Sequence, residues 1–177
     1  MMVLLFLITL LNSAYSADHI DFYLDKEYCL QEQKDVIFMA IDDINKALGC
    51  QSVTIKEKAF VDPNDNYISF DPSVLGRVPG DWVAWTFIYP DYVQIGLELG
   101  LESQKLYNTI IHEIGHSLGL AHNFNKRSIM FPYVEGGVPL VSNFNKIYRK
   151  YRWRWSHQLA ILLKKKNPNI CLNKLNL

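Results

Sequence analysis

The chain has 177 residues, of which 49% are hydrophobic and 20% are charged, and its formal net charge at pH 7 is zero. A chain of this length and composition can bury one sizeable core and leaves little room for a second folded domain. The balanced charge gives no reason to expect a nucleic acid partner, and we expect a monomer.

A short apolar run opens the chain. "MMVLLFLITLL" is followed by "SAYSA", in which Ala14 and Ser16 occupy the small-residue positions of a signal-peptidase site. The run is too short to cross a bilayer comfortably. We therefore expect residues 1–16 to be a signal peptide and residues 17–177 to form one secreted, extracellular domain. An uncleaved signal anchor is the alternative, because no basic residue precedes the run.

Hydrophobic periodicity predicts a mixed architecture. The predicted strands cover residues 19–24, 52–60, 67–70, 82–89 and 93–99. Apolar residues spaced by three and four predict amphipathic helices over 30–48 and 104–118, the second with Ser103 as its N-cap. "VDPNDN" predicts a turn, and "DPSVLGRVPGD" predicts a loop. This order favours a twisted sheet with helices packed on it, an α+β or α/β sandwich.

Three cysteines restrict the disulfide pattern. Cys29 and Cys50 stand at opposite ends of the helix over 30–48, which would be roughly 28 Å long at about 1.5 Å per residue. Bridged cysteines need α carbons within about 7 Å, so these two should not pair. We expect Cys171 to pair with one of them and leave one free thiol. The sequence does not decide between the two pairings.

Three of the five histidines lie in "HEIGHSLGLAH", residues 112–122. On the helix over 104–118, His112 and His116 lie one turn apart and opposite the apolar face. Gly119 favours a left-handed turn that would bring His122 back toward them. Three imidazoles with one coordination position free are typical of a catalytic zinc site. Glu113, beside the first ligand, is then placed to take a proton from water.

H-E-x-x-H-x-x-G-x-x-H followed by a methionine turn is the signature of the metzincin metallopeptidases, and "HEIGHSLGLAH" with "SIMFP" resembles the matrixin branch. The close match covers residues 104 to about 133. The resemblance implies a metzincin-type zincin fold, a mostly parallel sheet with an active-site helix and a C-terminal helix. It also implies zinc ligation by His112, His116 and His122, general base and acid catalysis by Glu113, and a hydrophobic floor at Met130.

The resemblance also implies a place for the substrate. The edge strand "WVAWTF", which includes Ala84, would pair with an extended peptide. Pro132 and Tyr133 would begin the wall of the pocket for the side chain after the scissile bond, and Asn108 would lie near its base. The expected substrate is therefore a protein or peptide.

Departures from the family pattern affect subfamily and metals. Matrixins have serine where this chain has Asn123, and tyrosine where it has Val134. Their second, structural zinc is held by upstream histidines, where Trp85 and Gln94 stand here, so we expect one catalytic zinc. Calcium is a family ligand for which "DPNDN" offers oxygens, although such a sequence is more typical of a plain turn.

Charge is segregated along the chain. All eighteen acidic residues lie at or before Glu135, whereas residues 144–177 hold nine basic residues and no acid. We expect this basic C-terminal segment to dock on the acidic body, with a helix that begins after an N-cap at Ser156 and ends in Lys164–Lys166. Residues 145–155 would form a surface excursion near Met130. The alternative is that the basic residues form a patch for a polyanion, such as an anionic matrix, or for a membrane surface.

These features predict a secreted zinc metalloendopeptidase that hydrolyses peptide bonds without a covalent intermediate. The alternative is a secreted peptide- or polyanion-binding module on a metzincin scaffold with little catalysis. Glu113 favours catalysis, because a protein that only binds peptides would have little use for a base beside the metal.

Overall fold

The computed structural model describes residues 19–71, 83–125, 127–132 and 144–171, with the backbone alone for 144–153. The predicted signal peptide, the predicted loop after Asp71 and Tyr133 lie outside these residues. No helix within the described ranges is long and apolar enough to cross a membrane.

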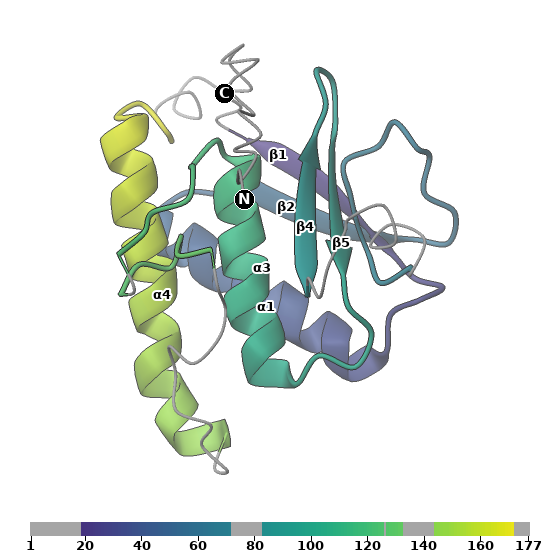
Figure 1. Ribbon diagram of the computed structural model, residues 1–177, viewed down its shortest axis with the longest axis horizontal. Helices are drawn as coiled ribbons and strands as arrows, with labels where there is room; N and C mark the ends of the chain where they lie inside the picture. Colours follow the sequence, from purple (N-terminus) through teal and green to yellow (C-terminus); the bar gives the residue numbers. More distant parts are fainter. Residues whose placement is uncertain (1–18, 72–82, 126, 133–143, 172–177) are drawn as a thin grey trace, which may run out of the picture.

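A five-stranded sheet forms one layer of the molecule (Figure 1). Its strands are β1 (Ile20–Asp25), β2 (Val53–Lys58), β3 (Tyr67–Ser69), β4 (Ala84–Ile88) and β5 (Val93–Leu97). Their order is β2-β1-β3-β5-β4, and only β4, at the edge, runs antiparallel to its neighbour. Each predicted strand is present, with its ends shifted by no more than two residues.

Helices cover one face of this sheet. They are α1 (Gln31–Leu48), α3 (Ser103–Ser117) and α4 (Phe144–Lys166). Alternate residues of a strand face opposite sides of a sheet, so Ile20, Phe22 and Leu24 share one face of β1. All three are buried in the core, which identifies this face as the one that the helices cover. On α3 the apolar face predicted from sequence is buried. The predicted α+β sandwich with a mostly parallel sheet, an active-site helix and a C-terminal helix is confirmed.

The prediction that Ser103 caps α3 is wrong. The helix begins at Ser103 itself and is preceded by Glu102, so Ser103 is the first helical residue. Its hydroxyl donates a hydrogen bond of 2.8 Å to the Glu32 carboxylate in the first turn of α1. The hydroxyl therefore links two helices instead of capping one.

The predicted start of the last helix is also wrong. Helix α4 begins at Phe144, and Ser156 lies fully buried in its middle. Residues 145–155 are therefore helical and do not form a surface excursion. Trp155 explains the longer helix in part, because it packs on the core one turn before Leu159 and extends the buried stripe backward.

Helix α4 packs against α1 and α3 (Figure 1), and it also forms hydrogen bonds with the chain after α3. Leu159 and Leu163 are buried in the common core. The Gln158 side chain accepts a hydrogen bond from the Ile129 amide and donates one to the Arg127 carbonyl. The predicted docking of the basic segment on the body is thus confirmed for its helical part, with apolar packing as its main described contact.

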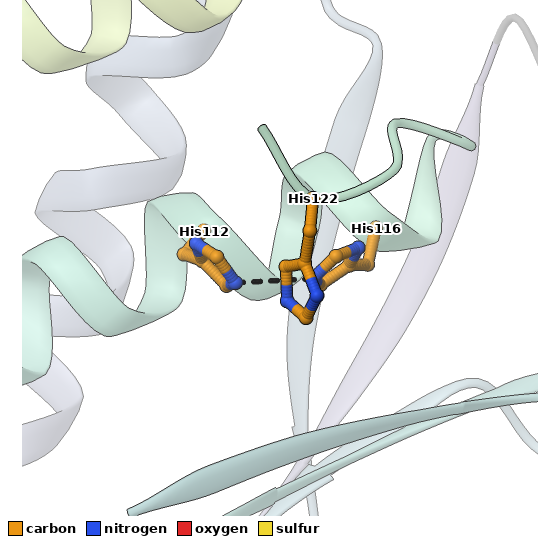
Figure 2. A group of neighbouring side chains, drawn as sticks. All are labelled: His112, His116 and His122. Atoms are coloured by element: carbon orange, nitrogen blue, oxygen red, sulfur yellow. Dashed lines mark hydrogen bonds between the residues drawn. The ribbon is translucent and has the colours of Figure 1, made fainter. Parts of the chain in front are cut away.

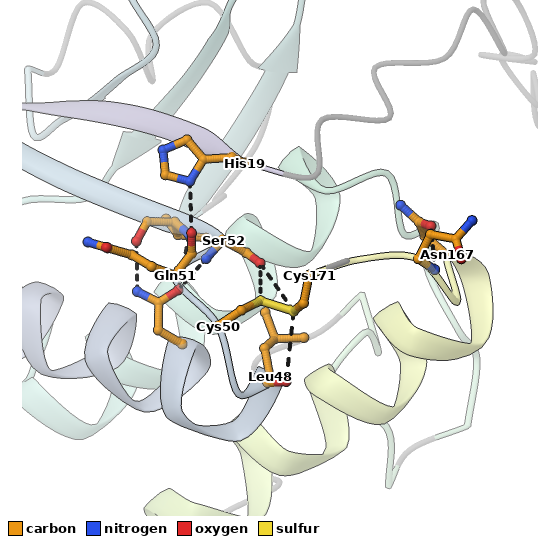
Figure 3. Close-up of a disulfide and its surroundings, with 10 residues drawn as sticks. His19, Leu48, Cys50, Gln51, Ser52, Asn167 and Cys171 are labelled. Carbon is orange, nitrogen blue, oxygen red and sulfur yellow. Dashed lines mark hydrogen bonds between the residues drawn. A yellow bond between two sulfur atoms is a disulfide. The ribbon is translucent and has the colours of Figure 1, made fainter. Parts of the chain in front are cut away.

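A disulfide joins the end of α1 to the chain beyond α4 (Figure 3). It links Cys50 to Cys171, whose α carbons are 5.6 Å apart. Cys29 is a free, buried thiol. The predicted pairing of Cys171 with one of the other two cysteines is confirmed, and the structure assigns Cys50 as its partner.

Candidate metal centre

Helix α3 presents two histidines on one side and its apolar residues on the other. Leu106, Ile110 and Ile114 face the core and are fully buried. His112 and His116 leave the opposite side one turn apart, and their ring centroids are 4.6 Å from each other. The four-residue spacing thus produces the convergence expected from helical geometry.

The chain reverses directly after α3. Gly119 has φ +85°, and its amide donates to the His116 carbonyl at 2.7 Å. A side chain at this φ would be strained, so glycine is the favoured residue. The turn brings the ring centroid of His122 to 4.6 Å from that of His116 (Figure 2). One ring nitrogen from each of the three histidines lies within 4.8 Å of the others.

Backbone carbonyls determine which ring nitrogens face the centre. Nδ1 of His112 donates to the Ile129 carbonyl at 2.7 Å, and Nδ1 of His116 donates to the Leu120 carbonyl at 2.8 Å. A neutral imidazole with its proton on Nδ1 has a lone pair on Nε2. The two Nε2 atoms face each other at 3.0 Å, a distance at which two lone pairs repel unless a cation lies between them. The donor set therefore fits a zinc ion.

Burial keeps these rings in the form that binds metal. It lowers the pKa of His112 to about 4 and the pKa of His116 to about 4. It also lowers the pKa of His122, which is more exposed. Neutral imidazole is the form that ligates a metal ion, so all three rings are available near pH 7.

Glu113 lies beside the histidines and is 5% exposed. Burial raises the pKa of its carboxyl to about 7, and a hydrogen bond from Thr86 acts in the opposite direction. Oγ1 of Thr86, on β4, donates to Oε2 of Glu113 at 2.5 Å. Sequence reasoning did not identify Thr86. Its alternation with Ala84 places it on the helix-facing side of β4, but no local pattern indicates which helical residue it meets.

Met130 lies beneath α3 and is 1% exposed. Its Sδ would be 2.6 Å from a Cβ at Gly115, so the two residues pack closely. The Met130 carbonyl accepts from the Asn123 amide at 2.7 Å, and the neighbouring Ile129 carbonyl accepts from His112. The methionine turn therefore packs against α3 at Gly115 and also orients the ring of His112.

The substrate-site residues implied by the family resemblance are only partly described. Asn108 is partly exposed on α3, one turn before His112. Ala84 is buried as the first residue of the edge strand β4, and Pro132 is partly exposed just after the methionine turn. Tyr133 lies outside the described residues. The described residues therefore place Asn108 one turn from His112, and by themselves they do not define a side-chain pocket.

The histidine triad is the one group of three or more His, Cys, Asp or Glu side chains, among the described residues, arranged to hold a metal ion. In the "DPNDN" turn, Asp65 is paired with Lys58 at 2.5 Å, and Asp62 accepts hydrogen bonds from Asn64. The oxygens of this turn already take part in an ion pair and in hydrogen bonds within the chain. The turn therefore gives no support for a calcium site.

Comparison with known proteins agrees with this centre. A family model described as Matrixin matches residues 11–144, about three quarters of the chain. A protein of Trichoplusia ni ascovirus 2c named "Putative matrix metalloproteinase" is 44% identical over 50 residues, which are 28% of this chain and 10% of that protein. The chain thus matches only about a tenth of that relative's length.

One solved structure that this chain matches is that of an archaemetzincin from Methanopyrus kandleri. It is 13% identical to this chain, with a TM-score of 0.41, and the alignment covers 84% of this chain and 95% of the archaemetzincin. At that score the likeness adds nothing to what the family match and the geometry establish. With three histidines on a helix and turn arranged to hold a metal ion, and with a family match over most of its length, the chain belongs to the matrixin family of zinc metallopeptidases.

Proposed function

We propose that the protein is a zinc-dependent endopeptidase in which Glu113 is the general base and acid. One observation carries the proposal: the Nε2 lone pairs of His112 and His116 converge with His122 beside a buried carboxylate. A structural zinc site would have no need of that carboxylate, because protein ligands usually fill all four positions.

A zinc ion held by the three histidines would supply a Lewis acid that polarises the peptide carbonyl and makes a water molecule more acidic. Glu113 accepts a proton from the attacking water and passes it to the leaving amine. A pKa of about 7, raised by burial, suits a group that must both take and give a proton near neutral pH. The hydroxyl of Thr86 holds the carboxylate in place during both transfers.

The edge strand β4 is the proposed binding surface for a peptide. Among the described strands it pairs with β5 alone, so its other edge faces no described strand and can accept an extended substrate by strand pairing. Thr86 places the middle of this strand against Glu113. A peptide paired with β4 would therefore run past the histidines.

We also propose that the protein acts outside the cell as a monomer. The Cys50–Cys171 disulfide supports this location, because disulfides persist mainly in oxidising compartments. An anionic matrix remains the proposed partner of the basic C-terminal segment, supported by the exposed Arg154 and by Lys164–Lys166 at the end of α4.

The decisive experiment compares Glu113→Gln with the wild type on a quenched-fluorescent peptide library, with bound zinc measured by mass spectrometry. The variant should keep one zinc and lose at least about 100-fold in kcat/KM, the lower range for general base catalysis. Glu98→Gln, which removes an exposed carboxylate, is the matched control and should retain activity.

Three results would contradict the proposal. Unchanged hydrolysis by Glu113→Gln would show that Glu113 is not the base, and loss of zinc would make it a metal ligand. Wild-type protein that binds zinc and library peptides without cleaving any would instead support the binding-module alternative.

A further inference from the structure

A pocket lies on the face of the sheet away from the helices. Thr86 on β4 points to the helix-facing side, so its neighbour Phe87 points to the other. Gln94 pairs with Phe87 in register and with Tyr67 on the other side, which places all three on that far face. Gln94 and Tyr67 line a pocket of about 400 Å³, a volume within the range of small-ligand sites.

Three carboxylates line this pocket, and among the described residues that line it there is no lysine, arginine or histidine. One network of hydrogen bonds connects them. Asp25 accepts from the Ser69 hydroxyl at 3.0 Å and from the Glu27 amide at 3.1 Å, and the Asp71 amide donates to the same Ser69 oxygen. The charges of Glu27, Asp71 and Asp25 also raise the pKa of the Tyr28 phenol at the pocket. Negative potential is therefore concentrated there.

A buried acceptor without a partner marks the same pocket. Gln94 is 3% exposed, and its Oε1 has no hydrogen-bond partner among the described residues. The side-chain amide cannot simply be flipped, because its nitrogen donates to the Pro63 carbonyl at 2.8 Å and an oxygen there would meet another acceptor. Buried polar atoms are normally paired, and a small rotation of the Gln94 side chain toward the pocket would let this oxygen accept from a donor outside the chain.

The surroundings favour an organic cation over a metal ion. The carboxylates do not converge tightly enough to form a metal-binding group, since among the described residues only the histidine triad does so. Aromatic rings line much of the rest of the pocket, together with small apolar residues. Tyr89 and Tyr92 stack at 4.3 Å between centroids, and Phe60 and Tyr28 are 83% and 39% exposed. Rings beside carboxylates suit a cation with an apolar stem.

We propose that this pocket binds the guanidinium of an arginine side chain from a polypeptide partner. Its acceptors are spread over Asp25, Glu27 and Gln94, and the five N–H donors of a planar guanidinium can reach several of them at once. The charge of Asp71 adds to the negative potential of the pocket. The aliphatic stem and the plane of the group pack on the tyrosine rings. The site lies across the sheet from the histidines and requires neither zinc nor hydrolysis.

The test uses the full chain and N-acetyl-arginine methylamide as the probe, with binding followed by NMR at the side-chain amide of Gln94. A saturable shift is expected, at least about tenfold weaker for the neutral citrulline analogue, since charged hydrogen bonds are lost. Glu27→Gln/Asp71→Asn should weaken arginine binding by at least about tenfold. The matched double variant Glu98→Gln/Glu102→Gln, which removes two exposed carboxylates elsewhere, should leave it unchanged.

Several outcomes would overturn the proposal. Absence of a saturable shift, equal binding of citrulline, or unchanged binding by a folded double variant would each do so. Equally tight binding of the lysine analogue would remove the case for a guanidinium, and a saturable shift with calcium alone would make this a metal site. If the double variant does not fold, Glu27→Gln serves instead, because Glu27 is exposed; it should weaken binding by about threefold or more.

Discussion

Among the described residues, Thr86 is the side chain from another element that donates a hydrogen bond to the Glu113 carboxylate. Thr86→Val removes the donor and keeps the shape, so kcat/KM should fall by about tenfold, the lower range for a hydrogen bond to a charged group. In the wild type the hydrogen bond from Thr86 lowers the pKa of Glu113. Because Thr86→Val lacks this bond, the pKa of Glu113 should be higher in the variant. Since the ionised form is the base, the acid limb of the kcat/KM profile should move to higher pH.

Thr86→Ser is the control for this prediction, because it retains the hydroxyl and should remain within about threefold of the wild type. Bound zinc should be the same in all three proteins. A valine variant with normal kcat/KM and an unshifted acid limb would mean that Thr86 is only a packing residue.

Gly115 is the second residue on which the site depends. A Cβ there would lie 2.6 Å from Met130 Sδ and 3.0 Å from Leu159 Cδ1. Gly115→Ala should therefore lower the free energy of unfolding by about 1–3 kcal/mol through overpacking, despite the better helix propensity of alanine. Urea denaturation measures this. In a Met130→Ala background the same change should cost at least about 0.5 kcal/mol less, and additive effects would exclude the contact.

The residues of the metal centre were predictable where they depend on local geometry. His112, His116, Gly119 and His122 lie within one helix and one turn, so their spacing in sequence determines their relation in space. Thr86 meets Glu113 across 27 residues of chain. That contact depends on how β4 packs against α3, which hydrophobic periodicity does not encode.

At the scale of elements, α4 should stabilise the fold through one face only. Leu159 is fully buried, whereas Ile161 is 59% exposed on the same helix. Leu159→Ala should lower the free energy of unfolding by about 2–5 kcal/mol, and Ile161→Ala by less than about 0.5 kcal/mol. Urea denaturation of both variants checks this. Equal losses would show that the helix does not dock as described.

Element types were predictable, and some boundaries and the sheet order were not. Strand alternation and helical stripes are properties of a few neighbouring residues, which explains why each strand was found within two residues. The start of α4 was missed because basic and aromatic residues lack a simple apolar period before Trp155. The position of β3 between β1 and β5 depends on long-range pairing that local patterns do not specify.

At the scale of the whole molecule, the number of reactive cysteine thiols per chain tests the fold. Burial raises the pKa of the Cys29 thiol to about 12, and the thiolate is the reactive form. At pH 8 the native protein should therefore react with a thiol reagent very slowly. Unfolding in guanidinium without reductant should expose one thiol per chain, and unfolding with reductant should expose three.

A different number of reactive thiols would contradict the Cys50–Cys171 pairing or the burial of Cys29. Three thiols without reductant would mean that the bridge is absent. A rapid reaction of the native protein would mean that Cys29 is accessible, and peptide mapping of the labelled residue would identify which cysteine reacted.

The Nδ1 protons of His112 and His116 are received by the carbonyls of Ile129 and Leu120, which belong to the chain after α3. An ion that fixes the two rings must therefore also fix residues 119–130, because ring orientation and chain order depend on the same hydrogen bonds. The stability of this segment becomes a function of free zinc, rising by about 1.4 kcal/mol for each tenfold increase above the dissociation constant. A chelator would then act on this segment as a local denaturant, while the sheet and α1 remain folded.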